Sequence, residues 1–316
     1  MRALVTGGAG FIGSHLCAAL VGRGDGVVCV DDLSTGDLRN VEELQQDPRF
    51  ELVVADVSKD TDVDGHLDAV LHFASSASPP DYLARPLETL AVGSEGTRHC
   101  LELAARHGAR FVLASTSEVY GDPLMHPQAE TYWGNVNPVG PRSVYDEAKR
   151  FAEALTMSWH RARRADVGIV RIFNTYGPRL RPGDGRVVSN FLVQALEGRP
   201  LTVYGDGTQT RSLCYVDDLV RGVVALLDSR LTGPVNMGNP DEMTMLDLAH
   251  TVIELTGSSS PIAHLPLPED DPTRRRPEIT FARRELGWEP VVPLREGLGH
   301  TASYLRSVVA TSGTSG

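Results

Sequence analysis

The chain has 316 residues, of which 41% are hydrophobic and 22% charged, and its formal net charge at pH 7 is −11. A chain of this length can build a large core and about one and a half to two domains. The net negative charge argues against a nucleic-acid-binding protein, because such a protein needs a broad positive surface. No apolar run approaches the roughly 18 residues of a membrane span.

The amino terminus runs directly into a predicted strand, so we expect no signal peptide. The four cysteines are scattered among apolar neighbours, without the spacing of a zinc site. We therefore expect free buried thiols, no bound metal and a cytoplasmic protein.

The first predicted elements are a buried strand at Arg2–Thr6 and a helix from about Ser14 to Val21, joined by a glycine-rich turn. Glycines let the backbone approach a pyrophosphate, and the helix amino terminus offers free N–H groups and a positive dipole end. The strand–turn–helix context makes this G-x-x-G-x-x-G spacing a strong indication of a dinucleotide site. Its predicted contacts are Gly7, Gly10, Phe11, Ile12 and Gly13.

The second predicted strand, Val27–Val30, ends at Asp31 and Asp32. A carboxylate at this position can accept the adenosine ribose hydroxyls and would repel a 2′-phosphate, which favours NAD over NADP. The alternative is that Asp31 only caps a loop. The turn that follows is placed to contact the same ribose through Ser34, Thr35 and Gly36.

Four further apolar runs read as strands, separated by two long predicted helices, Leu87–Ala105 and Tyr145–Arg163. The strands are Glu51–Val54, Ala69–Phe73, Arg110–Ala114 and Val167–Arg171. Near-continuous apolar strands that alternate with helices predict an α/β fold with a Rossmann-type, doubly wound parallel sheet. Ligands gather beyond the carboxyl ends of such strands, where we expect Asp56, Val57, Phe73, Ser75, Thr116, Ser117 and Glu118. His72 is expected to be a core histidine.

Tyr145 and Lys149 lie four residues apart, on one face of the second predicted helix. A cation beside a tyrosine stabilises the phenolate, which can then take a proton from an alcohol. Reaching neutrality from a pKa of about 10 needs roughly 4 kcal/mol, which an ammonium and an oxidised nicotinamide could supply together. The only other lysine is Lys59, so a chain that otherwise uses arginine keeps a compact ammonium here.

The composition changes beyond residue 177, where prolines and glycines divide the chain into short elements. We predict an NAD-binding domain at 1–177, to which the chain returns at about 212–238, and a smaller mixed α/β substrate-binding domain at 178–316. Residues Cys214 to Leu227 read as the returning strand and helix. A last helix starts near Leu294, and Thr311–Gly316 is expected to be a mobile tail.

Four stretches resemble the extended short-chain dehydrogenase/reductase family of nucleotide-sugar enzymes, and within it the UDP-glucuronate decarboxylases. They are Ser115–Pro123, Tyr132–Lys149, Asp184–Phe191 and Asp270–Pro277. The resemblance covers nearly the whole chain, and the second stretch, YWGNVNPVGPRSVYDEAK, is the most specific. It implies an enzyme that uses NAD and a UDP-sugar and that forms a homodimer.

The chemistry that the resemblance implies begins when Tyr145, assisted by Lys149, takes the proton of the sugar C4 hydroxyl while NAD takes the C4 hydride. The resulting β-keto acid loses carbon dioxide, and the hydride returns to C4 to give UDP-xylose. Thr116 would bind near the C4 oxygen, and Glu118 and Arg275 would act near C5 and C6. The other implied substrate contacts are Asn174, Asn190, Tyr204 and Arg211, with Arg211 on the diphosphate and Tyr204 near the uracil.

The chain departs from the family pattern at Gly93, where an asparagine is usual three residues before a Gly-Thr pair. A contact that braces the helix against the sheet is therefore expected to be missing. The alternatives within the fold are a UDP-sugar 4-epimerase, which typically lacks Glu118, and a 4,6-dehydratase, which usually has an acid at the position of Ser117. A non-catalytic NAD-binding sensor is the alternative outside enzymes.

Overall fold

In the computed structural model, which describes residues 1–59, 62–267 and 274–312, seven parallel strands form one sheet in the order β11-β6-β5-β4-β1-β2-β3. This confirms the predicted doubly wound parallel sheet. From β1 the chain moves outward through β2 and β3 and then crosses back, so that β4 pairs with the other side of β1. The strands are β1 (Arg2–Thr6), β2 (Gly26–Asp31), β3 (Phe50–Val54), β4 (Ala69–His72), β5 (Arg110–Thr116), β6 (Val167–Ile172) and β11 (Pro234–Met237).

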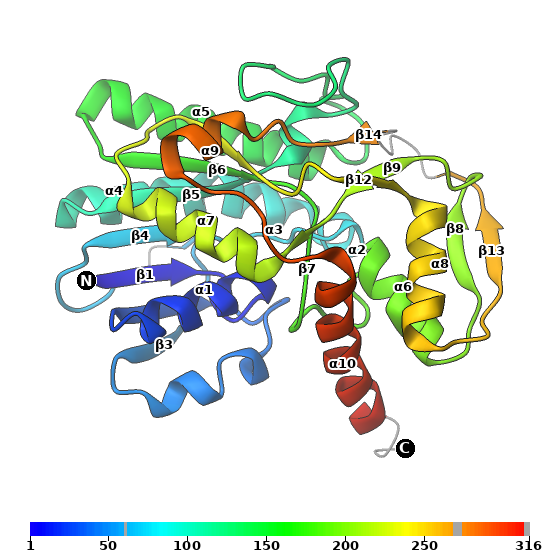
Figure 1. The fold of residues 1–316 in the computed structure, drawn as a ribbon. Coiled ribbons are helices and arrows are strands. Elements are labelled where there is room, and N and C mark those ends of the chain that lie inside the picture. The colour runs from blue at the N-terminus through cyan, green and yellow to red at the C-terminus, as the bar shows by residue number, and fades with distance from the viewer. Residues whose placement is uncertain (60–61, 268–273, 313–316) are drawn as a thin grey trace.

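Helices cover both faces of the sheet (Figure 1). On one face α1 (Phe11–Gly22) packs beside α7 (Val216–Asp228), and on the other α4 (Thr97–His107) packs beside α5 (Ser143–Arg163). The two faces bury separate apolar clusters because the strands are buried on both sides. Leu20 and Val223 belong to the first cluster, and Leu101, Phe111 and Trp159 belong to the second.

A smaller set of elements lies beyond the carboxyl ends of the main strands, at the right of Figure 1. Two strand pairs run through it, β8 (Leu201–Tyr204) with β13 (Ile262–Leu265) and β9 (Thr210–Ser212) with β12 (Glu242–Thr244), and β14 (Arg274–Arg275) also pairs with β9. Its helices include α6 (Val187–Leu196), α8 (Met245–Thr256) and α10 (Leu294–Ser312). The domain boundary at residue 177 stays a prediction.

Several boundaries differ from the sequence prediction. Helix α1 begins at Phe11 rather than near Ser14, and β5 continues to Thr116. The strand that returns to the main sheet is β11, because β10 (Cys214–Tyr215) pairs with β7 (Thr175–Tyr176) in a separate two-stranded sheet. Helix α10 continues through Ser312, and the rest of the predicted tail lies outside the described residues, as do residues 270–273 of the quoted Asp270–Pro277 stretch.

The predicted helix Leu87–Ala105 is three segments, α3 (Pro86–Ala91), a π-helical turn η3 (Val92–Gly96) and α4. At the π-helical turn, Gly93 packs on Ala148 of α5, so closely that an added Cβ would lie 2.7 Å from the Ala148 Cβ. The expected missing contact is therefore replaced by close helix–helix packing. No helix within the described ranges combines the length and the apolar character that a membrane span requires.

Candidate active site

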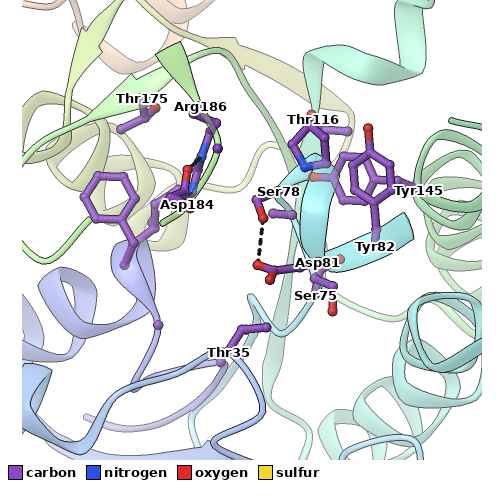
Figure 2. Close-up of a pocket in the computed structure, with 18 of the residues that line it drawn as sticks. Thr35, Ser75, Ser78, Asp81, Tyr82, Thr116, Tyr145, Thr175, Asp184 and Arg186 are labelled. Carbon is purple, nitrogen blue, oxygen red and sulfur yellow. Dashed lines mark hydrogen bonds and ion pairs between the residues drawn. The ribbon is translucent and has the colours of Figure 1, made fainter. Parts of the chain in front are cut away.

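A cavity of about 680 Å³ opens at the carboxyl ends of the main strands. It is lined by the turn after β1, the ends of β2, β4 and β5, the start of α5, and a segment at 179–191 with parts of β8 and β9. In Figure 2, Thr116 and Tyr145 lie across the cavity from Asp184 and Arg186, and Thr35 lies further along it. Polar side chains from opposite halves of the molecule therefore face one another.

The glycine-rich turn between β1 and α1 packs so closely against neighbouring backbone that side chains do not fit at Gly7 and Gly13. Gly7 has a φ of +68°, and a Cβ added to it would lie 2.7 Å from the backbone nitrogen of Ala74. A Cβ on Gly13 would lie 2.1 Å from the carbonyl oxygen of Gly7. Helix α1 begins directly after Gly10 with no side-chain cap, so its first N–H groups lie beside the cavity that Gly7, Gly10, Phe11, Ile12 and Gly13 line. The turn thus fits a pyrophosphate.

Asp31 ends β2 at the same edge and accepts hydrogen bonds from the backbone N–H groups of Ala9 at 2.9 Å and Leu33 at 2.8 Å. Burial raises the pKa of Asp31 from its ordinary value, while these backbone hydrogen bonds oppose the rise. Other predicted cofactor residues also line this part of the cavity: Asp32, Ser34, Thr35, Asp56, Val57, Phe73 and Ser75. An acidic edge of this kind fits the ribose of NAD and disfavours a 2′-phosphate.

Gly36 is the one predicted cofactor contact that is not among the described residues lining the cavity, and its contact with the cofactor stays a prediction. It packs against the Asp31 carboxylate, and a Cβ at Gly36 would lie 2.6 Å from Asp31 Oδ1. Gly36 is thus required by the close approach of the Ser34–Gly36 turn to Asp31.

Tyr145 and Lys149 lie one turn apart on α5, and both are buried. The Lys149 ammonium is 5.9 Å from the centre of the Tyr145 ring and donates a hydrogen bond to the carbonyl oxygen of Ala114 at 2.9 Å. Burial raises the pKa of Tyr145 well above its ordinary value, and a hydrogen bond with Thr116 opposes the rise. Burial also lowers the pKa of Lys149 to about 8. The two side chains alone therefore do not produce a phenolate at neutral pH.

Tyr82 of α2 (Pro79–Ala84) stacks on Tyr145, with ring centres 5.3 Å apart and ring planes 6° from parallel, as Figure 2 shows. The stacked ring holds the Tyr145 ring in one orientation. Tyr82 lines the cavity and was not predicted from the sequence, since nothing in the α2 segment marks a partner 63 residues further on.

Glu118 lies on the short helix η4 (Ser117–Tyr120), directly after β5, and faces the cavity. Its Oε2 accepts hydrogen bonds from Arg142 at 2.7 Å and from Arg275 at 3.1 Å. Burial alone would raise the pKa of Glu118, but the charges of Arg275 and Arg142 hold it below its ordinary value. Glu118 is therefore a carboxylate in the ligand-free site.

Two predicted substrate residues, Ser117 and Arg275, are not among the described residues that line this cavity. Both are buried at about 1% exposure, and the Arg275 guanidinium donates to the Ser117 carbonyl oxygen as well as to Glu118. Arg275 bonds to Glu118, which is among the residues that line the cavity. Their direct contact with a substrate is not supported by this geometry.

The remaining predicted residues lie on the far wall, the part of the cavity lining that comes from segments after β6. Asn174, Asn190, Tyr204 and Arg211 all line the cavity. Sequence reasoning missed Arg186, which pairs with Asp184 and lies 5.7 Å from the centre of the Phe11 ring. It also missed Arg142, although this arginine precedes Tyr145 by three residues within a stretch that was singled out as specific.

Comparison with known proteins identifies the class. The model of the NAD dependent epimerase/dehydratase family matches residues 3–238, and the chain belongs to this family. It is an enzyme of the extended short-chain dehydrogenase/reductase type, and NAD is its cofactor.

The chain is 52% identical to UDP-glucuronic acid decarboxylase 1 of Arabidopsis thaliana, over 97% of this chain and 70% of that protein. Solved structures are more distant. UDP-glucose 4-epimerase of Thermotoga maritima, with UDP-glucose, is 29% identical with a TM-score of 0.89, over 98% of this chain and 100% of the other. UDP-glucuronic acid 4-epimerase of Bacillus cereus, with UDP-glucuronic acid and NAD, is 30% identical with a TM-score of 0.85, over the same shares.

Proposed function

We propose that the protein is a UDP-glucuronate decarboxylase that forms UDP-xylose and carbon dioxide and regenerates its NAD in each turnover. The observation that carries the proposal is the 52% identity, over 97% of the chain, to a curated decarboxylase. The solved 4-epimerases share the fold at about 30% identity. The cavity supports the proposal because it places a tyrosine, a lysine and a glutamate at the end of β5.

Tyr145 is the proposed base for the sugar C4 hydroxyl, and Thr116, which lies beside it in the cavity (Figure 2), is proposed to bind near the C4 oxygen and help position Tyr145. Bound NAD supplies the hydride acceptor for C4 and a positively charged ring near the site. Because burial raises the pKa of Tyr145, the Lys149 ammonium and that ring must together lower it before the hydroxyl proton can be taken. Lys149 is held in place by the Ala114 carbonyl oxygen.

Oxidation at C4 makes the substrate a β-keto acid. The C5–C6 bond then breaks, carbon dioxide leaves, and the electron pair is delocalised from C5 onto the C4 ketone. Glu118 is the proposed acid–base group at C5, and Arg142 and Arg275 fix its orientation through one shared oxygen, Oε2. Proton return from Tyr145 to the C4 oxygen completes the turnover when the hydride returns to C4.

The far wall is proposed to bind the UDP moiety. Arg211 suits the diphosphate because a guanidinium can bind phosphate oxygens with two parallel hydrogen bonds. Tyr204, which is 40% exposed and also lines the cavity, is the proposed contact for the uracil. Asn174 and Asn190 are proposed polar contacts to the sugar and phosphate groups between these ends.

The alternative function is a 4-epimerase, and the observation that favours it is the similarity to the solved 4-epimerases. Incubation of the protein with UDP-glucuronate separates the two. We expect carbon dioxide release in step with UDP-xylose formation, without added NADH. The appearance of UDP-galacturonate with no carbon dioxide would instead establish epimerisation.

A homodimer is also proposed. Four large apolar side chains are exposed on α2, α3 and α5, which pack against one another: Leu83, Leu87, Leu90 and Phe151. A second copy of the chain can cover this surface. A cytoplasmic location is proposed as well, supported by the four buried cysteines, all of which are free thiols.

A further inference from the structure

Decarboxylation consumes a proton, and neither Tyr145 nor Glu118 supplies it. The substrate carboxylate leaves as neutral carbon dioxide, so C5 must gain one proton in each turnover. Tyr145 cannot be its source, because the proton that Tyr145 removes from the C4 hydroxyl returns to the C4 oxygen. Glu118 is a carboxylate in the ligand-free site, because Arg142 and Arg275 lower its pKa. The proton for C5 then comes either directly from solvent or from another titratable group near Glu118, and these two sources can be told apart by experiment.

Asp146 lies one helical turn after Arg142, the residue that donates to Glu118 Oε2, and its backbone N–H donates to the Arg142 carbonyl oxygen at 3.2 Å. It follows Tyr145 in the first turn of α5, and its residue is only 6% exposed. Its Oδ1 atom is buried and has no hydrogen-bond partner among the described residues. A buried carboxylate oxygen without a partner is costly when it is ionised and much less so when the group is protonated.

The charges around Asp146 come from three elements. Glu118 lies on η4, Arg275 on β14, and Arg142 and Glu147 at the start of α5. Burial and then Glu118 raise the pKa of Asp146 to about 7, while Arg142 and Arg275 oppose the rise. The positive end of the helix dipole would by itself favour a carboxylate in this turn, so burial and Glu118 prevail over it. The raised pKa and the buried Oδ1 without a partner together fit a group that can hold a proton close to neutral pH.

We infer that Asp146 stores the proton that C5 receives after decarboxylation, and that it is a positioning residue acting through Glu118. The inference rests on the proposed decarboxylase function. When the substrate carboxylate approaches Glu118, a further negative charge comes near Asp146 and favours its protonated form. The proton is thus taken up on binding, before the C5–C6 bond breaks. After the bond breaks, the proton moves through Glu118 to C5, and Asp146 is reprotonated from solvent.

The first test measures proton uptake on binding, by isothermal titration in buffers of different ionisation enthalpy between about pH 6 and 9. The probes are UDP-glucuronate with the Tyr145→Phe variant, which prevents turnover, and UDP-xylose, which lacks the carboxylate. We expect uptake of a large fraction of one proton with UDP-glucuronate and much less with UDP-xylose. Adding Asp146→Asn should abolish the difference, whereas adding Glu147→Gln, the neighbouring carboxylate on α5, should retain it. Equal uptake with and without Asp146→Asn would overturn the inference.

The second test is kinetic. With an otherwise native chain, Asp146→Asn should lower kcat about 100-fold with KM changed less than about threefold, as expected for loss of proton transfer. Asp146→Glu should recover part of kcat. Glu147→Gln removes the weakest of the charges that raise the Asp146 pKa, so it should keep kcat and shift the pH profile only slightly toward lower pH. If the native protein releases no carbon dioxide, the proposed function is wrong. If it does and Asp146→Asn has the native kcat and pH profile, only the role of Asp146 is wrong.

Stability gives a readout that is independent of turnover and shows whether the variant folds. The folded-state pKa of Asp146 is raised from its ordinary 3.8 to about 7, so ionising this group costs stability as pH rises through that window. Asp146→Asn should therefore gain stability relative to the native protein as pH rises from about 4 to 7 in denaturant titrations. A constant difference across this range would contradict the raised pKa and with it the stored proton.

Discussion

At the scale of single residues, the ligand-free site holds its proposed base in the inactive protonated form. Tyr145 is buried under the ring of Tyr82, with a hydrogen bond to Thr116, and its pKa is raised by burial. Lys149 is one turn away, but its pKa is itself lowered to about 8. The Tyr-x-x-x-Lys pair can therefore lower the tyrosine pKa to near neutrality only together with the positive charge of the bound cofactor.

Tyr145→Phe tests this assignment. Removing the phenolic hydroxyl should leave UDP-glucuronate binding nearly unchanged and lower turnover by at least two orders of magnitude, because only the proton transfer is lost. Carbon dioxide release measures turnover, and calorimetric titration measures binding. Near-native turnover in this variant would refute the assignment of the base.

At the scale of elements, the packing of η3 on α5 explains the departure at Gly93. A Cβ added at Gly93, where the family resemblance implies an asparagine, would lie 3.1 Å from the Ala148 backbone and 2.7 Å from the Ala148 Cβ. The turn is π-helical here, and the Thr97 hydroxyl donates to the Gly93 carbonyl oxygen at 2.9 Å. Because Ala148 directly precedes Lys149 on α5, the contact between Gly93 and Ala148 also determines where Lys149 lies relative to β5.

Gly93→Asn should therefore destabilise the protein by about 1–3 kcal/mol, the usual cost of overpacking a close contact. Combining it with Ala148→Gly should recover part of the loss, since the nearest atom is removed. Ala148→Gly alone is the control and should cost about 1 kcal/mol for glycine in a helix. Denaturant unfolding of the three variants gives the coupling energy, and strictly additive losses would show that the two positions do not compete for space.

At the scale of the whole molecule, the cavity exists because two halves of the chain meet over the ends of the main strands. The Arg181 guanidinium on one side pairs with Asp81 on the other, and Asp81 also accepts from Ser78, as Figure 2 shows. The same side of the molecule as α5 carries the exposed apolar side chains that we propose a second copy covers. Since α5 bears both Tyr145 and Phe151, pairing of two copies would hold the helix that carries the base.

Leu87→Arg tests the proposed dimer. Leu87 is 76% exposed in the single chain, and burying a leucine contributes about 1.5–3 kcal/mol. A charge at this position should shift the protein toward a monomer in sedimentation velocity measurements. Leu124→Arg is a matched control, because Leu124 is 84% exposed outside this surface. If the native protein sediments as a monomer, or if Leu87→Arg leaves a dimer intact, the proposed interface is wrong.

Most of the predictions of the fold and the site came from patterns of residues that are close together in the sequence. The glycine turn, Asp31 at the end of its strand, and the pairing of Tyr145 with Lys149 each depend on neighbours within one or two elements, where backbone geometry is set by spacing. The cofactor followed from the glycine turn and Asp31, and the parallel sheet followed from the alternation of apolar runs with helices. Helix boundaries such as the start of α1 and the break at η3 were missed, because tertiary packing rather than propensity decides them.

The surroundings of Glu118 were decided only by the tertiary structure. Arg275 lies 157 residues from Glu118 in the chain and reaches it because β14 pairs with β9 beyond the ends of the main strands. Arg142 and Asp146 are near Tyr145 in sequence, but their effect on Glu118 depends on how η4 lies against α5. By itself the sequence determined the oxidant and the proposed base, since local spacing places both. The charge and proton content of the groups around C5 depend on burial and on charges from distant segments, which only the folded chain brings together.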